Sequence, residues 1–354
     1  MTLKLDKTQK EIVNSNESKI LVIAGSGSGK TRVLTERIKR LINNGVPTEN
    51  IVAITFTNFA ADEMKERLGN IVGEAFIGTI HSYANKILLA NGISTIRYIE
   101  EENFDKFFEL IKNNDITFPY VEHLLVDEYQ DIGQKEYEFF NLLKPKNFMA
   151  VGDDYQNIFG FRSADVSIFL DMAKNPNTKV YMMTKNYRSG ADIIEFASHF
   201  MSSVQDKIYK EANCVNNYGE VIRLNGLNIK YLTELIKDTD SFGDWFILTR
   251  KNSEIDMMGD FLTEAEIPWD SFKKSELETE QIKTKMKENT VKILTVHAAK
   301  GLENKNVIVI GVKPFYDEER RVAYVAATRA KDLLIWVKNI AIKKERKEKI
   351  NKWE

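Results

Sequence analysis

The residues best suited to chemistry lie between positions 20 and 31, where the sequence reads ILVIAGSGSGKT. An apolar run typical of a buried strand gives way to a glycine–serine turn and then to Lys30 and Thr31. In such a loop the backbone N–H groups surround an anion, the lysine reaches the β- and γ-phosphates, and the threonine hydroxyl ligates Mg²⁺. A glycine–serine turn alone is usually only a surface loop, but here it follows a strand and ends in Gly-Lys-Thr. The sequence therefore predicts a nucleoside triphosphate site made of Ala24, Gly25, Ser26, Gly27, Ser28, Gly29, Lys30 and Thr31.

An acidic segment supplies what such a loop needs for hydrolysis. Residues 124–131 read LLVDEYQD, an apolar run that ends in Asp127 and Glu128. Asp127 is predicted to hold Mg²⁺, directly or through water, and Glu128 to polarise the attacking water. A strand that merely ends in an acidic turn is the alternative. Together with the phosphate loop, the segment predicts an ATPase.

The elements that must position these residues alternate along the chain. Helix-like stretches such as 32–42 and 60–68 lie between strand-like apolar runs, which predicts an α/β fold with doubly wound parallel sheets. A joint is expected near 184–186, which would divide the chain into domains 1–184 and 185–354. The strands are expected at 20–24, 51–56, 123–127, 148–152, 179–183, 246–249, 292–296 and 307–311.

Composition narrows the class of protein. At 354 residues the chain is long enough for two domains, and its net charge of −2 offers no overall attraction to a polyanion, so any nucleic-acid contact must be local. The single cysteine excludes a disulfide framework and a cysteine-rich metal site. Neither a signal peptide nor a run of 18 apolar residues is present, so a cytoplasmic protein without membrane contact is expected. The charged stretch 271–289 predicts an exposed helix or excursion, and 338–352 a solvated terminal helix or a basic arm.

Further motifs recur in one order along nearly the whole chain, and together they resemble a UvrD/Rep/PcrA-type superfamily 1 DNA helicase. This resemblance implies two RecA-like P-loop NTPase domains. Its segments are LDKTQKEIV at 5–13, TFTNFAADEM at 55–64, GTIHS at 78–82, VGDDYQNIFGFRSA at 151–164, NYRS at 186–189, TVHAAKGLE at 295–303 and EERRVAYVAATRA at 318–330.

For ATP, the resemblance implies a role for each matching residue. Gln156 would sense the γ-phosphate beside Lys30 and Glu128, while Arg188 and Arg329 would be arginine fingers of the second domain that reach ATP when a cleft closes. Taken alone, either arginine would be read as a surface ion pair. The resemblance also implies nucleotide contacts by Gln9 and Tyr187 at adenine, Glu303 at the ribose, Gly301 near the γ-phosphate, and Arg32 and Arg37 as lesser candidates.

For DNA, the resemblance implies aromatic platforms in a groove. Phe56, Phe159 and Phe161 occupy the stacking positions, although each alone could be a core residue. Phe161 replaces the family's tryptophan, and Phe59 replaces a lysine, so both changes put DNA affinity in question. The expected contacts to the DNA backbone are Thr55, Asn58, His81, Arg162, Thr295 and His297.

Two intervals are shorter than in relatives of this family. Only residues 83–125 separate GTIHS from the acidic segment, and only 190–294 separate NYRS from TVHAAKGLE. The expectation is a compact form whose accessory domains are reduced or missing.

These observations favour an ATP- and Mg²⁺-dependent monomeric motor that moves 3′ to 5′ on single-stranded DNA, acts at single-strand/duplex junctions, and gains processivity from a protein partner. The alternative is a nucleotide-gated DNA-binding ATPase module that serves a larger defence or recombination complex, or remodels protein–DNA complexes, without unwinding. A nucleotide kinase would leave the DNA-type motifs without a role.

Overall fold

The computed structural model describes residues 4–160, 164–272 and 279–340, which form two compact units. Unit 1 comprises Met1–Arg188 and Ser203–Asn216, and unit 2 comprises Ser189–Ser202 and Asn217–Glu354. The chain therefore passes from one unit to the other three times. The predicted domains 1–184 and 185–354 meet at one boundary. The compact units do not follow it, because residues 185–188 and 203–216 belong to unit 1. The boundary between the two motor domains therefore stays a prediction.

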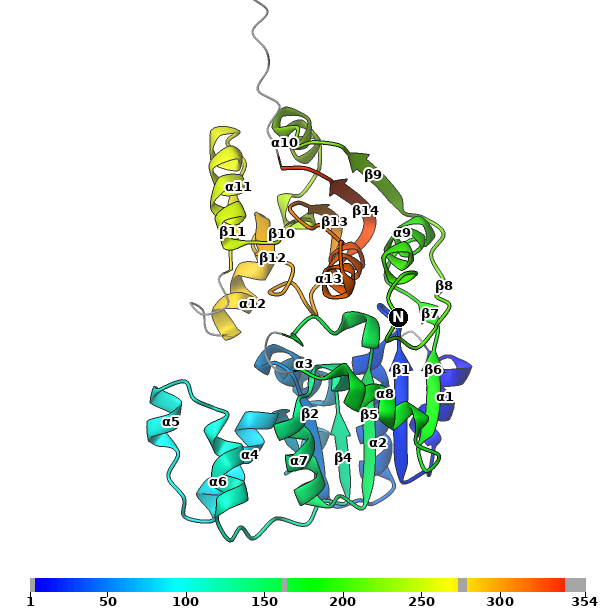
Figure 1. Ribbon diagram of the computed structural model, residues 1–354, viewed down its shortest axis with the longest axis vertical. Helices are drawn as coiled ribbons and strands as arrows, with labels where there is room; N and C mark the ends of the chain where they lie inside the picture. The colour runs from blue at the N-terminus through cyan, green and yellow to red at the C-terminus, as the bar shows by residue number, and fades with distance from the viewer. Residues whose placement is uncertain (1–3, 161–163, 273–278, 341–354) are drawn as a thin grey trace, which may run out of the picture. The chain divides into compact units, whose positions relative to one another are not determined.

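Unit 1 is built on a parallel sheet in the order β3-β2-β4-β5-β1-β6 (Figure 1). The phosphate loop follows β1, and its neighbours in the sheet are β5 and β6. A short parallel pair, β7 with β8, joins Lys185–Asn186 to Asn213–Cys214. The sheet strands are β1 Lys19–Ala24, β2 Ile51–Thr55, β3 Phe76–Thr79, β4 His123–Val126, β5 Asn147–Gly152 and β6 Lys179–Met183.

Helices cover both faces of this sheet because its strands are apolar on both sides. Along β1, Leu21 and Ile23 pack into one core with α4, α6, α7 and α8, whereas Ile20, Val22 and Ala24 pack into the other with α1, α2 and α3. This two-sided burial explains the continuous apolar runs of the sequence. The helices are α1 Lys7–Asn14, α2 Lys30–Asn43, α3 Asn58–Leu68, α4 Ile80–Ala90, α5 Ile96–Glu100, α6 Lys106–Asn113, α7 Gln134–Leu143 and α8 Val166–Lys174.

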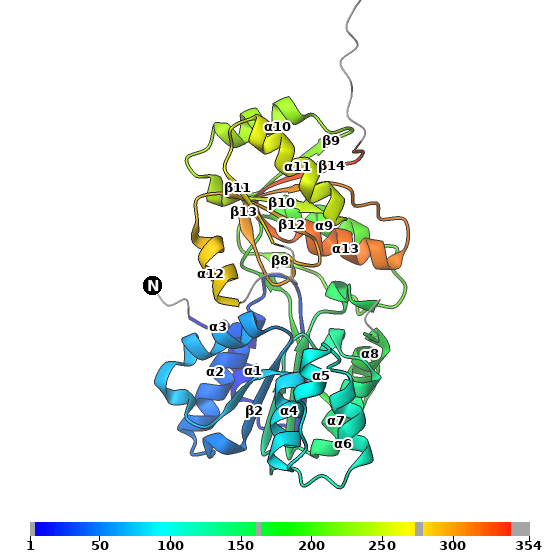
Figure 2. The same ribbon diagram turned by 90° about the vertical axis from the view of Figure 1, so that its left-hand side faces the viewer.

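Unit 2 repeats the architecture with a parallel sheet in the order β11-β12-β10-β13-β14-β9. Helices α10 and α11 share one core with this sheet, and α9 packs on α13 and on the strands β9 and β14 (Figure 2). The strands are β9 Glu220–Leu224, β10 Trp245–Thr249, β11 Trp269–Ser271, β12 Val291–Thr295, β13 Asn304–Val309 and β14 Ala330–Val337. The helices are α9 Ala191–Met201, α10 Ile229–Lys237, α11 Asn252–Glu264, α12 Thr279–Lys287 and α13 Asp317–Ala327.

The predicted α/β class with parallel sheets is confirmed, and each predicted strand corresponds to an observed one. The sheet strands β3, β9, β11 and β14 and the short pair β7 and β8 were not predicted. The stretch 271–289 does contain a helix, α12, whereas most of the charged tail 338–352 lies outside the described residues. Every helix within the described ranges is too short or too polar to span a lipid bilayer.

The short interval 83–125 forms little more than α4, α5 and α6, which lie together in unit 1 (Figures 1 and 2). The second interval, 190–294, supplies β9 to β12 with their helices and hence much of the sheet of unit 2. The first interval thus holds a few helices and the second holds core strands of unit 2, which is compatible with the expected compact form.

We predict that His123, at the start of β4, makes unit 1 sensitive to acid. Burial lowers the pKa of His123 to about 4, from an ordinary value of 6.5. Between about pH 6.5 and pH 4, His123 is protonated in the unfolded chain but neutral in the folded chain. The free energy of unfolding therefore falls as the pH decreases over this range. In urea titrations at several pH values, His123→Gln should lose less stability over this range than the wild type. His199→Gln, at an exposed position of α9, is the control and should follow the wild type.

Candidate active site

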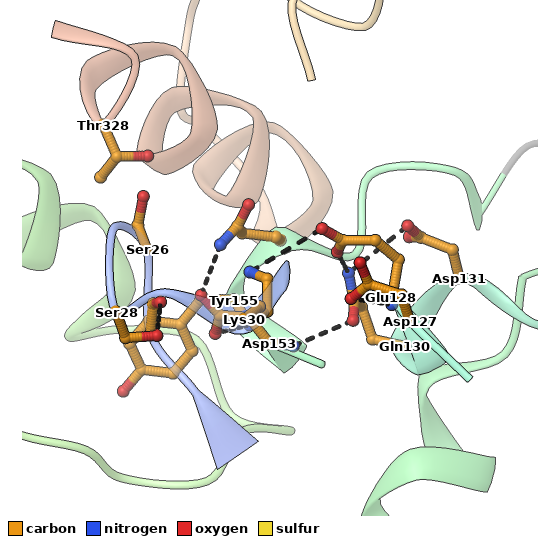
Figure 3. A network of polar contacts seen from close by, with 12 residues as sticks. Ser26, Ser28, Lys30, Asp127, Glu128, Gln130, Asp131, Asp153, Tyr155 and Thr328 are labelled. Atoms are coloured by element: carbon orange, nitrogen blue, oxygen red, sulfur yellow. Dashed lines mark hydrogen bonds and ion pairs between the residues drawn. The ribbon is translucent and has the colours of Figure 1, made fainter. Parts of the chain in front are cut away.

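The phosphate loop lies between the end of β1 and the start of α2, as predicted. Gly27 and Gly29 adopt φ values of +67° and +89°, a region that favours glycine, and Gly29 directly precedes α2. The Ser28 hydroxyl donates to the carbonyl of Gly25 at 2.7 Å, which closes the turn (Figure 3). The N-terminal N–H groups of α2 are thereby presented at an anion-binding position.

Residues 186–188 of the NYRS segment fasten this loop within unit 1. Asn186 Nδ2 donates to the carbonyl of Ser26 at 2.6 Å, and Tyr187 N donates to the carbonyl of Gly27 at 2.9 Å. Arg188 Nη1 lies 3.1 Å from Ser26 Oγ. A Cβ at Gly27 would lie only 2.7 Å from Arg188 Cβ, so glycine is needed for this close approach.

Arg188 therefore belongs to the unit that carries the phosphate loop, which differs from the expectation that it is carried by the other half of the chain. The division falls immediately after it: the Ser189 hydroxyl donates to the carbonyl of Ala330 at 2.6 Å, within unit 2. One four-residue motif is thus anchored to both units because its first three residues bond to the loop and its last residue bonds to β14.

A hydrogen-bonded chain connects the proposed adenine residues. Gln9 is 2 % exposed, and its Nε2 donates to the carbonyl of Ser28 at 3.0 Å. Asp6 caps α1 through a reciprocal pair of bonds with Gln9, and it also accepts the Tyr187 hydroxyl at 2.6 Å. Burial together with the bond to Asp6 raises the pKa of Tyr187 to about 12. Asp6 thus bonds both residues proposed to contact adenine: its carboxylate accepts the Gln9 backbone N–H and the Tyr187 hydroxyl, and its own backbone N–H donates to Gln9 Oε1.

Arg37, a lesser candidate for contact with the nucleotide, instead bonds the backbone at the end of α1. It is 4 % exposed and donates to the carbonyls of Ile12, Val13 and Ser15, at the C-terminal end of α1. Although the Ile12 carbonyl also accepts the Ser15 N–H, carbonyls at the C-terminal end of a helix are short of donors and favour a nearby cation. Arg37 fixes α1, and with it Gln9, against α2.

The acidic segment lies at the end of β4 on the same edge of the sheet. Glu128 adopts a φ of +50°, and its Oε1 lies 3.8 Å from Lys30 Nζ (Figure 3). Asp127 is 6 % exposed; burial and the neighbouring charge of Glu128 raise its pKa to about 7, against the opposing effect of Lys30. A divalent cation would relieve this repulsion, and the donor set of one carboxylate and the Thr31 hydroxyl suits Mg²⁺, which also takes oxygen from phosphates and water.

A relay of amides and carboxylates runs from Glu128 to Gln156. Gln130 Nε2 donates to Glu128 Oε2 at 2.6 Å, and Gln130 Oε1 accepts from the backbone N–H of Asp153 at 2.9 Å (Figure 3). Asp153 Oδ2 in turn accepts from Gln156 Nε2 at 2.8 Å. Gly152 makes the contact possible, since a Cβ there would lie 2.4 Å from Gln130 Oε1. Because β5 pairs with β1, the strand that precedes the phosphate loop, the relay lies at the same edge of the sheet as the loop.

Of the remaining nucleotide candidates, Arg32 lies in α2 of unit 1, and Gly301, Glu303 and Arg329 lie in unit 2. Arg329 is 1 % exposed and donates to the carbonyls of Val325 and Leu302 at 3.0 and 3.1 Å. Glu303 forms an ion pair with Lys331 at 3.0 Å, and Gly301 has a φ of +89° with open space around its Cβ position. Their roles at ATP remain predictions.

The expected DNA residues have different environments. Phe159 is only 3 % exposed and stacks on the half-buried Phe56, with ring centroids 4.9 Å apart. Phe161 and Arg162 lie outside the described residues. The structure thus presents Phe56 as the outer ring and Phe159 as the support beneath it.

The polar candidates also differ from one another. Thr55 is buried, with its hydroxyl donating to the carbonyl of Thr57 at 3.0 Å, whereas Asn58 is exposed at the start of α3. His81 lies against the rings of Phe104 and Phe108, and burial lowers its pKa, so at neutral pH it could offer a phosphate a hydrogen bond but not a charge. In unit 2, Thr295 Oγ1 accepts from the N–H of Ala298 at 3.2 Å and His297 follows in the same turn.

Sequence reasoning missed several residues of this site. Asn186, Gln130 and Asp153 lie inside motifs that were recognised, so attention to every polar position in those motifs could have found them. Asp6 carried the weaker signal of a helix-capping pattern three residues before Gln9. Lys210, described below, lies in no recognised motif.

Comparison with known families agrees with this geometry. The UvrD/REP helicase N-terminal domain matches residues 5–120 and 112–177, and the UvrD-like helicase C-terminal domain matches residues 270–339. The chain belongs to the UvrD/Rep helicase family. Both RecA-like domains of this family are therefore represented, which confirms the predicted resemblance and fold class.

Individual relatives are distant. The chain is 26 % identical to the ATP-dependent DNA helicase PcrA of Leuconostoc citreum, with 76 % of this chain aligned to 50 % of the relative. It is also 26 % identical to DNA helicase II of Haemophilus influenzae, over 75 % of this chain and 51 % of the relative. A probable DNA helicase of Mycoplasma pneumoniae, again 26 % identical, is matched over 94 % of this chain and 83 % of its own length. The chain thus spans about half the length of the PcrA and helicase II relatives.

Gly27→Ala is predicted to weaken nucleotide binding by more than about tenfold. The new Cβ would meet Arg188 and Asn186 within 2.8 Å, and the left-handed φ of a residue other than glycine costs about 1–2 kcal/mol. Gly45→Ala is the matched control, because Gly45 has a φ of +86° but nothing within 4 Å of its Cβ position. Titration with a fluorescent ADP should separate the two variants. Equal affinities would show that contact between the loop and residues 186–188 is unnecessary.

Proposed function

We propose that this protein is an ATP-dependent motor that moves on single-stranded DNA, 3′ to 5′, and separates duplex strands at junctions. The observation that carries the proposal lies at the carboxyl edge of the unit 1 sheet, where Glu128 follows Asp127, lies 3.8 Å from Lys30 and is linked to Gln156 through Gln130 and Asp153. Membership of the UvrD/Rep family supports the choice of DNA as the track. We further propose that the protein works as a monomer in the cytoplasm and that a protein partner increases its processivity.

ATP would bind with its phosphates over the loop and its adenine between Gln9 and Tyr187. Lys30 would supply the charge for the β- and γ-phosphates, while Arg32 and Glu303 would contribute further contacts. Thr31 and Asp127 would hold Mg²⁺, which neutralises charge on the phosphate oxygens when bound. Asp6 would hold the adenine residues in register because it bonds both α1 and the Tyr187 hydroxyl.

Hydrolysis would use Glu128 to orient a water and accept its proton, with Gln130 fixing the second carboxylate oxygen of Glu128. Gln156 and Arg188 would then contact the γ-phosphate, and Arg329 would complete the cationic surround. An arginine placed in this way contributes about 10³–10⁵ in rate. Turnover therefore depends on where Arg329 lies, which couples hydrolysis to movement between the two RecA-like domains.

The division of the NYRS segment supports this coupling. Arg188 bonds Ser26 in the phosphate loop, and the next residue bonds β14, which follows directly after Arg329. A change in the loop on ATP binding or product release would therefore be transmitted through a single peptide bond. The two units would alternate their grips on DNA as this link shifts.

The DNA track would run over Phe56 and the proposed platform Phe161, with polar contacts from Asn58, His81, Arg162, Thr295 and His297. Base stacking on an aromatic ring contributes about 1–3 kcal/mol per base and tolerates any sequence. Phe159 would act mainly by supporting Phe56.

The alternative is a nucleotide-gated module that binds DNA or remodels protein–DNA complexes without unwinding. The complete set of catalytic side chains favours a turning-over motor, because a switch needs no residue in the position of Glu128. DNA-dependent turnover is the property that distinguishes the two.

We expect oligo-dT to raise the rate of ATP hydrolysis by the wild type at least tenfold. This corresponds to a decrease in the activation free energy of about 1.4 kcal/mol. Glu128→Gln should abolish this turnover while retaining ATP binding, since the amide cannot accept the proton. Phosphate release measured with and without oligo-dT tests both statements. Turnover that ignores DNA would contradict the motor and favour the gated module.

Phe56→Ala should weaken oligo-dT binding by about 1–3 kcal/mol, roughly 5- to 150-fold, with little change in thermal stability. Phe159→Ala should instead destabilise unit 1 by about 3–5 kcal/mol, because it empties a buried site. Fluorescence anisotropy and thermal melting of both variants provide the comparison. Equal losses of DNA affinity without any loss of stability would assign base stacking to Phe159 as well.

A further inference from the structure

One buried lysine of unit 1 lies outside all the motifs considered so far. Lys210 belongs to the segment Ser203–Asn216, by which the chain leaves α9 of unit 2, returns to unit 1 and leaves again for β9. Its side chain is 5 % exposed. An ammonium group is rarely buried to this extent unless it is paired, so its partners indicate what it does.

The partners are the two aspartates that follow β5. Lys210 Nζ lies 2.9 Å from Asp153 Oδ1, and it also bonds Asp154 Oδ1. Both carboxylates are fully buried. The ammonium lies 3.5 Å from the ring centroid of Tyr155, which adds a cation–π contact. Although burial alone would lower the pKa of Lys210, the two aspartates raise it, so the lysine is charged at neutral pH.

Asp153 connects this lysine to the nucleotide site. One of its carboxylate oxygens accepts Lys210, and the other accepts Gln156 Nε2 at 2.8 Å. Its backbone N–H donates to Gln130, whose amide bonds Glu128. Asp154 differs in this respect: its second oxygen accepts the backbone N–H of Ile208 at 2.8 Å, so Asp154 holds the returning segment rather than Gln156.

The segment 203–216 also supports the phosphate loop through a short pair of strands. Asn213 and Cys214 form β8, which pairs with β7, and β7 contains Asn186, the residue that bonds the carbonyl of Ser26. Residues 203–216 thus contact both the Asp153–Gln156 turn and the strand that fastens the loop. No ligand is needed to explain these contacts, which indicates a positioning role.

We infer that Lys210 is a positioning residue that sets Gln156 through Asp153, so that the segment 203–216 controls how unit 1 detects the γ-phosphate. The inference rests on the proposed function, in which Gln156 contacts that phosphate. Without the cation, two adjacent buried carboxylates would repel each other and the Asp153 side chain would turn, taking its bond to Gln156 with it.

Lys210→Met is the direct test, and Lys207→Met is its control in the same segment, where the lysine bonds the carbonyl of Val204 instead. Lys210→Met should lower the kcat of DNA-stimulated ATP hydrolysis by about 10²-fold, the effect of a small misplacement of a reacting group. Its affinity for fluorescent ADP, which has no γ-phosphate, should stay within about twofold of the wild type. Combined with Gln156→Ala, it should cause no further loss, because both changes remove the same contact.

Two isosteric variants keep the test decisive if Lys210→Met does not fold. Asp153→Asn and Asp154→Asn alter neighbouring, equally buried residues that both contact Lys210; Asp153 bonds the Gln156 side chain, whereas Asp154 bonds the backbone N–H of Ile208. Asp153→Asn should reproduce the loss of kcat, and Asp154→Asn should retain most of the turnover. Similar effects of the two variants would contradict the inference.

Other outcomes separate this inference from the proposed function. If the wild type turns over ATP with DNA but Lys210→Met behaves like Lys207→Met, or if its loss multiplies with that of Gln156→Ala, only the positioning role is overturned. Equal loss of ADP affinity and kcat would assign Lys210 to the framework of unit 1 and overturn it too. A wild type without DNA-dependent turnover would remove the proposed function and this inference together.

Discussion

The structure of unit 1 depends on the burial of acidic side chains at one edge of its sheet. Asp127, Asp153 and Asp154 are almost or completely removed from water, and Glu128 stands beside them. Isolated buried carboxylates would be very costly, so each must have a cation, an N–H donor or a proton. Lys30, Lys210 and backbone N–H groups meet part of this requirement. Burial and the charge of Glu128 nevertheless raise the pKa of Asp127 to about 7, so the requirement is not fully met at this residue.

This constraint explains why the edge is so thoroughly connected. A carboxylate can accept several hydrogen bonds, so each acid links neighbouring elements: Asp6 joins α1 to Tyr187, and Asp153 joins the turn after β5 to the segment 203–216. In a buried network, moving one member leaves others unsatisfied, so rearrangements are concerted. Such a network is suited to transmit the presence of a phosphate over several residues.

The family was recognised from the local spacing of its motifs, but several strands and buried side chains could be identified only from the tertiary structure. The order of Gly, Lys and Thr after an apolar run predicted the phosphate loop. Its strand, its glycine turn, its lysine and its threonine are all consecutive in the sequence, so the motif can be read without the fold. The strand β14 was not predicted because its first residues, Ala330 to Asp332, follow the arginine motif and are partly polar. Edge strand β9 was missed because EVIRL includes the charged residues Glu220 and Arg223, which interrupt its apolar run. Burial of Phe159 and Arg37 could not be predicted, because helix or motif position does not reveal what covers a side chain.

The sequence by itself determined the chemistry: the triphosphate loop, its acidic partner, the alternation of strands and helices, and the family. These features are short-range, since hydrogen-bonding patterns, backbone freedom at glycine and strand periodicity act over a few residues. Only the tertiary structure decided that Arg188 belongs to the unit of the phosphate loop, that Arg37 holds α1, and that Lys210 pairs with two aspartates more than fifty positions earlier. Such partnerships depend on which groups are taken out of water together, and that choice is made by the packing of the whole unit.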